Sequence, residues 1–254
     1  MGNAVNGILF QPPEPTYIPD PHLIWLKTKS NQRIACFFLN RSAPLTILFS
    51  HGNAEDLGMI LHYFQDTVPD LPCNIFAYDY TGYGRSSGTA SEEEIYSDIE
   101  ASFRYLRDVL GIPWTEIVLF GRSLGTAAST HLASLTPVRG MILQCPMLSL
   151  FRIAFNSTFS IPGDQLKSID RIGKIEAPTL VIHGTDDEIV PFWHGVELQK
   201  GCKNGVEPYW VDKGDHNNLE VIDNAEFIRR VVGFLQTLEA TPIDDALRNQ
   251  PILI

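Results

Sequence analysis

The stretch Ile117–Thr126, IVLFGRSLGT, decides the fold. Its first four residues are apolar, which is typical of a buried parallel strand. A glycine, an arginine, Ser123, a leucine and a second glycine follow at once, and the small residues at 126–129 favour a helix packed close to the sheet. A serine flanked by glycines at a strand-to-helix turn is the pattern of a nucleophile elbow. This context predicts that the turn holds the Ser123 hydroxyl at the carboxyl end of a sheet.

Apolar runs on both sides of this stretch indicate the rest of the sheet. Further strands are expected over residues 23–26, 34–39, 45–50, 75–80, 141–144, 179–182 and 209–211. Apolar residues at three- and four-residue steps predict an amphipathic helix over 92–110, and a last helix is expected over about 225–238. Strands that alternate with helices predict an α/β protein with a mostly parallel sheet covered on both faces. Together with the elbow, this pattern predicts the α/β-hydrolase fold.

Length and composition indicate one folded domain. The chain has 254 residues, of which 44% are hydrophobic and 19% charged. We expect an N-terminal segment over 1–22, the hydrolase domain over 23–240 and a C-terminal tail over 241–254. The net charge of −11 argues against nucleic acid as a partner and against electrostatic docking on anionic lipid.

The four cysteines are widely spaced and include no CxxC pair. Reduced thiols and a cytoplasmic location are therefore expected. The sequence also contains no secretory signal and no run of apolar residues long enough to span a membrane.

A serine hydroxyl becomes a good nucleophile only when a base removes its proton, and in this fold the chain order is serine, acid, histidine. Downstream of Ser123 the histidines are His131, His183, His194 and His216. We select His216 as the base because it follows the last strand in a loop. The acid is expected in the loop after strand 179–182, where Asp186, Asp187 and Glu188 compete.

Catalysis also needs N–H donors for the developing oxyanion. Leu124 follows the nucleophile and is expected to supply one backbone donor. Asn53, in the loop after strand 45–50, is expected to supply the other. We expect no metal and no cofactor, because no HExxH pattern occurs and the glycine-rich loop at 82–88 has the spacing GxGxxxG.

Seven stretches of the chain are distinctive: PPEPTY at 12–17, HGNAEDLG at 51–58, DYTGYGRSSG at 79–88, GRSLGT at 121–126, HGTDDEIV at 183–190, VEPYWV at 206–211 and HNNLE at 216–220. In these stretches the chain resembles the α/β-hydrolase domain-containing protein 17 family, whose members are membrane-associated protein depalmitoylases. The resemblance runs from about Phe10 to Leu238. It implies Ser123 as nucleophile, His216 as base and Asp187 as acid, with Asp186 as the alternative.

The chain departs from the family pattern in three places. Arg122 stands where the family usually has glutamine, and Asp215 stands where a glycine is usual. The family's cysteine-rich, palmitoylated segment has no counterpart here, where residues 1–6 read MGNAVN. Gly2 is therefore a candidate for myristoylation, although Asn6 replaces the usual serine or threonine of that motif. A single acyl chain would give only weak peripheral contact with the cytoplasmic face of a membrane.

The resemblance implies an acyl-thioester or ester hydrolase whose substrates are S-acylated proteins. A small cap is expected over 146–159, where Leu148, Phe151, Phe155 and Phe159 either line an acyl pocket or pack in the core. One alternative function is an esterase for lipids or small esters, or a serine peptidase, on the same fold. Another is an inactive hydrolase that serves as a binding module. The oligomeric state does not follow from the sequence.

Overall fold

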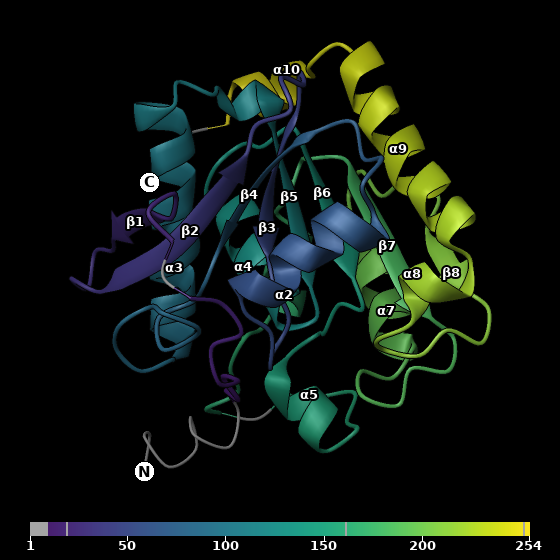
Figure 1. Cartoon of the computed structure of the whole chain (residues 1–254). Coiled ribbons are helices and arrows are strands. Elements are labelled where there is room, and N and C mark those ends of the chain that lie inside the picture. Colours follow the sequence, from purple (N-terminus) through teal and green to yellow (C-terminus); the bar gives the residue numbers. More distant parts are fainter. Residues whose placement is uncertain (1–9, 19, 161, 251) are drawn as a thin grey trace.

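The computed structural model describes residues 10–18, 20–160, 162–250 and 252–254. Eight strands form one sheet in the order β1-β2-β4-β3-β5-β6-β7-β8 (Figure 1). The strands are β1 Ile24–Lys27, β2 Arg33–Leu39, β3 Thr46–Ser50, β4 Asn74–Tyr78, β5 Ile117–Arg122, β6 Gly140–Gln144, β7 Thr179–Gly184 and β8 Tyr209–Val211. Strands β1 and β2 pair antiparallel, as do β2 and β4, and the other pairs are parallel. The mostly parallel sheet predicted from the sequence is confirmed.

The strand order reverses beside β3, and this reversal locates the site. The chain passes from β3 outward to β4, then returns across the sheet to β5 on the other side of β3. In open α/β sheets, ligands bind outside the carboxyl ends of the strands at such a switch point. Ser50 at the end of β3 pairs in register with Gly121 near the end of β5. The loops that follow β3 and β5 are therefore neighbours.

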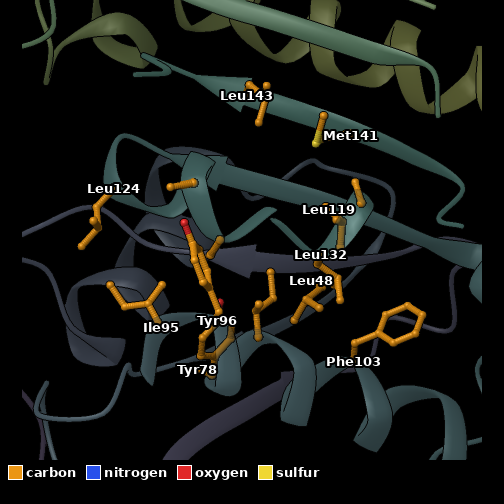
Figure 2. Close-up of a cluster of buried hydrophobic side chains, with 14 of the residues drawn as sticks. Leu48, Tyr78, Ile95, Tyr96, Phe103, Leu119, Leu124, Leu132, Met141 and Leu143 are labelled. Atoms are coloured by element: carbon orange, nitrogen blue, oxygen red, sulfur yellow. The ribbon is translucent and has the colours of Figure 1, made fainter. Parts of the chain in front are cut away.

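Helices cover both faces of the sheet because side chains along each strand alternate between the faces. Leu48 of β3 packs in one buried cluster with α3 and α4, whereas its neighbour Phe49 packs in a second cluster with α2 and α9. Figure 2 shows part of the first cluster, in which Ile95 and Phe103 of α3 and Leu132 of α4 share the core with strand residues such as Leu48 and Leu119. The helices are α2 Leu57–His62, α3 Glu92–Arg104, α4 Leu124–Ala133, α5 Leu150–Ala154, α6 Ile169–Ile172, α7 Trp193–Gly201, α8 Leu219–Ile222, α9 Asn224–Ala240 and α10 Asp245–Arg248.

The ends of the helices differ from the sequence predictions. The helix expected over 92–110 ends as an α-helix at Arg104 and continues as a π-helical segment, Tyr105–Val109. Its start agrees, because Ser91 caps it by accepting a hydrogen bond from the Glu94 N–H. Helix α2 was not predicted, although Asp56 caps its first turn and is a recognisable start signal. In the part of the chain that the structure describes, no helix has the length and apolarity needed to cross a membrane.

Candidate active site

Ser123 lies at a tight turn between β5 and α4. Its backbone has φ 51° and ψ −112°, a conformation that non-glycine residues rarely adopt. The turn brings the chain so close to itself that both flanking glycines are required. A Cβ on Gly121 would lie 2.4 Å from the carbonyl oxygen of Gly125, and a Cβ on Gly125 would lie 1.9 Å from that of Ser50. The sterics therefore explain the GxSxG pattern and hold Ser123 beyond the sheet's carboxyl edge.

The structure brings Ser123, His216 and Asp187 together. His216 Nε2 lies 2.8 Å from Ser123 Oγ, and its Nδ1 lies 2.7 Å from Asp187 Oδ2. Asp187 comes from the loop after β7, and His216 comes from the loop after β8. Both side chains are buried, whereas Ser123 is partly exposed. The three groups thus form a continuous chain from hydroxyl to imidazole to carboxylate, as in a serine-protease triad.

Backbone and side-chain donors hold the Asp187 carboxylate in its ionised form. Its Oδ1 accepts hydrogen bonds from the N–H groups of Ile189 and Val190, at 2.9 and 2.8 Å. Burial opposes ionisation, but hydrogen bonds from His183 and His216 hold the pKa of Asp187 well below its usual range. An ionised Asp187 can orient the imidazole and stabilise the imidazolium.

The contact from His183 to the acid was not foreseen from the sequence, which indicated only a structural role for this residue. Its Nε2 lies 2.8 Å from the carbonyl oxygen of Val190, which can only accept, so Nε2 carries the proton. The same nitrogen lies 3.2 Å from Asp187 Oδ2. The sequence did contain a signal for this contact, which is a histidine four residues before the acid at the end of the preceding strand.

Comparisons with known proteins agree with this geometry. A family model described as the alpha/beta hydrolase fold matches residues 46–163. Alpha/beta hydrolase domain-containing protein aho-3 of Caenorhabditis elegans is 36% identical over 95% of this chain and 80% of its own length. Alpha/beta hydrolase domain-containing protein 17C of Mus musculus is 41% identical over 82% of this chain and 66% of its own length.

The chain belongs to the α/β-hydrolase domain-containing protein 17 family. The resemblance noted in the sequence is therefore confirmed. Among solved structures, an esterase from Pyrococcus furiosus, Pf2001, superposes with a TM-score of 0.73 at 18% identity. The match covers 89% of this chain and 98% of that chain. At this identity the likeness establishes the shared fold alone.

In this member of the protein 17 family, the alternative acid and bases lie elsewhere. The Asp186 side chain is exposed and accepts a hydrogen bond from the Thr185 hydroxyl. His131 lies on α4 and pairs with Glu100 of α3 at 3.0 Å. His194, near the start of α7, accepts the Leu148 N–H through Nδ1.

The residues that we call the oxyanion loop, 51–56, follow β3 and lie beside Ser123. Leu124 is the first residue of α4, so its N–H has no partner within the helix and lies at the positive end of the helix dipole. Within the loop, Gly52 donates its N–H to Glu55 Oε2 at 2.6 Å. The Asn53 Oδ1 accepts from Gln11 N and from the Tyr83 hydroxyl.

The expected cap contains α5 and exposes aromatic side chains. Phe151 and Phe155 pack with ring centroids 4.5 Å apart and tilted ring planes, and Phe155 and Phe159 are 68% and 66% exposed. These phenylalanines line a cup of about 420 Å³ formed by Phe151 and residues 155–159. Leu148 does not line this cup, because its side chain is fully buried in the core. Leu148 therefore packs in the core, whereas an acyl-binding role for the three phenylalanines stays a prediction.

One group of potential metal ligands occurs among the described residues, formed by Cys145, Asp187 and His216. The last two are already joined by the hydrogen bond of the triad. Burial and the nearby Asp187 carboxylate raise the pKa of the Cys145 thiol well above its usual range. Because Asp187 bonds to His216 and His216 bonds to Ser123, the arrangement of these residues suits proton transfer. Gly2, the candidate for myristoylation, lies outside the described residues.

Proposed function

We propose that this chain is a serine hydrolase that cleaves acyl thioesters or esters, with S-palmitoylated proteins as its substrates. The observation that carries the proposal is the hydrogen-bonded series Ser123 Oγ, His216 and Asp187. A lone serine at a strand-to-helix turn would not support this function. A serine with a base in hydrogen-bond contact, and that base oriented by an ionised carboxylate, meets the requirements of nucleophilic catalysis.

The proposed reaction has two halves. Ser123 Oγ attacks the acyl carbonyl while His216 Nε2 takes its proton, and the N–H groups of Leu124 and Asn53 stabilise the oxyanion. His216 then returns the proton to the departing thiolate or alkoxide, which leaves an acyl group on Ser123. In the second half, water attacks the acyl carbon while His216 takes its proton. His216 then passes that proton to Ser123 Oγ as the bond between Oγ and the acyl carbon breaks and the fatty acid leaves. Asp187 keeps the imidazole in the required tautomer throughout.

Two observations support an acyl substrate. The chain belongs to the protein 17 family, and its resemblance to that family implies protein depalmitoylation. The exposed phenylalanines of the cap provide apolar surface on a loop that follows β6. Because Ser123 donates its N–H to Gln144 O at the end of β6, the cap begins beside the nucleophile. An esterase for small substrates is the second candidate, because solved structures of the same fold include esterases.

A fluorophosphonate probe tests the nucleophile. We expect the wild-type protein to be labelled and Ser123→Ala to be unlabelled, since the probe reacts only with an activated serine. Turnover should fall by about 10⁶-fold, as in other serine triads that lose the nucleophile. Circular dichroism of Ser123→Ala should match that of the wild type. A folded wild-type protein that resists labelling would instead support the inactive binding module.

A substrate series tests the chemistry that follows. Rates on a palmitoyl-cysteine peptide, on acyl esters of increasing chain length and on aminoacyl amides separate the candidates. We expect kcat/KM to be highest on the palmitoyl thioester. A maximum on acetyl or butyryl esters would favour the small-ester esterase, and turnover of amides would favour the peptidase.

A further inference from the structure

We propose that Arg122 and Glu55 form a clamp that positions the oxyanion loop against the nucleophile elbow and neutralises the Glu55 charge beside the oxyanion. The inference rests on the proposed function, because it assigns a role to two residues next to that site. Arg122 and Glu55 are positioning residues, since they act through the loop and through Ser123's turn. We call this ion pair the clamp.

The two oxygens of one carboxylate join the two halves of the site. Glu55 Oε1 lies 3.0 Å from Arg122 Nη1, and Glu55 Oε2 accepts the Gly52 N–H at 2.6 Å. Arg122 is part of β5 and directly precedes Ser123, whereas Gly52 and Glu55 belong to the oxyanion loop. The backbone pairing of β3 with β5 ends at Ser50 and Gly121. The clamp therefore continues the connection between these strands beyond the last paired residues.

The loop has a conformation that needs such support. Ala54 lies between Gly52 and Glu55 and has φ 59°, in the left-handed region. Non-glycine residues rarely adopt this conformation, so the contacts around the loop must hold it. The carboxylate of Glu55 folds back on the Gly52 N–H and closes the turn around Ala54. An anchored loop keeps its N–H groups directed at one place, which is what oxyanion stabilisation requires.

The clamp also places a negative charge close to the nucleophile. A Cβ at Gly52 would lie 2.8 Å from Glu55 Oε2 and 3.7 Å from the Ser123 Cβ. The clamp is partly shielded from water, since both of its side chains are 13% exposed. An unpaired carboxylate here would oppose the charge that develops on the substrate oxygen. The positive charge of Arg122 balances the charge of Glu55. Burial disfavours the charged guanidinium, but Glu55 and Glu220 raise the pKa of Arg122 above its ordinary value.

The guanidinium of Arg122 also lies over an aromatic ring. Its guanidinium carbon lies 5.8 Å from the centroid of the Tyr63 ring. The Tyr63 hydroxyl donates to Glu220 Oε1, which also accepts from Gln144 Nε2 at the end of β6. The clamp is thus one end of a buried polar network that links β5, β6 and α8 around the elbow.

Three variants test the clamp: Arg122→Gln, Glu55→Gln and the double variant. Glutamine at 55 can still accept the Gly52 N–H through its amide oxygen, but it carries no charge. We expect Arg122→Gln to lower kcat by about 10-fold or more with little change in KM, because it leaves Glu55 unpaired. Glu55→Gln should cost less. The double variant should regain most of the activity that Arg122→Gln loses.

Arg104→Gln is the matched control. It removes an arginine–glutamate pair on α3, away from the site, and should leave kcat unchanged. Melting temperatures of all variants show whether a loss of kcat follows a loss of stability. If Arg122→Gln does not fold, the double variant is compared with Glu55→Gln alone. Similar activity of these two proteins supports the clamp.

Two results would contradict the proposed role of the clamp while leaving the proposed function intact. One is an Arg122→Gln protein with wild-type kcat. The other is a double variant that is no more active than Arg122→Gln, which would indicate only a structural ion pair. Failure of the proposed function is recognised separately, because the wild-type protein itself would then show neither labelling nor turnover.

Discussion

Asp98 is a buried carboxyl group whose proton uptake should affect stability. Thr81 donates to it twice, from its N–H at 2.7 Å and from its hydroxyl at 2.9 Å. Burial nevertheless raises the pKa of Asp98 to about 8, against about 3.9 for an aspartate in an unfolded chain. Between these values the folded state binds more protons than the unfolded state. This group therefore makes the free energy of unfolding fall as pH rises from about 4 to 8.

Asp98→Asn tests this dependence. An asparagine keeps an acceptor for the Thr81 N–H and never ionises, so the variant should lose less stability between pH 5 and pH 8 than the wild type does. Urea unfolding at pH 5, 6.5 and 8 measures the difference. Comparing the two proteins at each pH cancels the contributions of other titrating groups, including Asp79, whose pKa burial raises to about 7. Parallel curves for the two proteins would contradict the prediction.

Some residues of the site could be predicted from the sequence, and others could not. The GxSxG motif and the order of residues along the chain predicted Ser123 as nucleophile and His216 as base, and the structure brings these two side chains into hydrogen-bond contact. The choice of Asp187 over Asp186 needed the family resemblance, since both lie in the same loop. The contact of His183 with the acid and the pairing of Arg122 with Glu55 escaped prediction. The pairing of Arg122 with Glu55 joins the end of β5 to the loop after β3, and a local pattern does not encode such a contact. The contact of His183 is local, within β7 and the loop that follows it, and depends on how the chain turns there.

At the scale of elements, apolar runs located every strand of the sheet, with ends that moved by one or two residues. Strands buried on both faces are continuous apolar runs, so their positions are clear in the sequence. Helix ends were less predictable. The two π-helical segments, Tyr63–Thr67 and Tyr105–Val109, each extend an α-helix and carry no distinct sequence pattern.

The cap helix α5 gives a prediction about the substrate. Phe155 and Phe159 expose most of their surface, so replacing both with serine should not lower the melting temperature. If they contact the acyl chain, kcat/KM on a palmitoyl thioester should fall by about 10-fold or more, because burying an aromatic side chain contributes about 1.5–3 kcal/mol. The rate on an acetyl ester should stay the same. Val109→Ser, at another exposed apolar residue, is the control. Equal losses on both substrates would exclude the acyl contact.

At the scale of the whole molecule, both ends of the described chain are fastened to the domain. Near the N-terminus, Thr16 donates its N–H to Asp56 of the oxyanion loop at 2.6 Å, and the Tyr17 hydroxyl donates to Asp79. In the C-terminal tail, helix α10 lies at the other end of the domain from α5 (Figure 1). The sequence indicated no partner for this tail. The structure places Leu247, which is 3% exposed, in the same buried cluster as α3 and α4.

The position of the tail predicts a stability effect without a catalytic effect. Arg139 donates to the Thr241 carbonyl, and Leu253 donates its N–H to Leu135 O at 3.2 Å. A chain that ends at Ala240 loses these bonds and the burial of Leu247, which alone contributes about 1.5–3 kcal/mol. We expect its urea midpoint to fall clearly, and Leu247→Ala to reproduce much of the decrease. Below the new midpoint, kcat/KM per folded molecule should equal that of the full chain, because these contacts lie away from the carboxyl edge of the sheet. An unchanged midpoint would mean that the tail is not bound to the domain in solution.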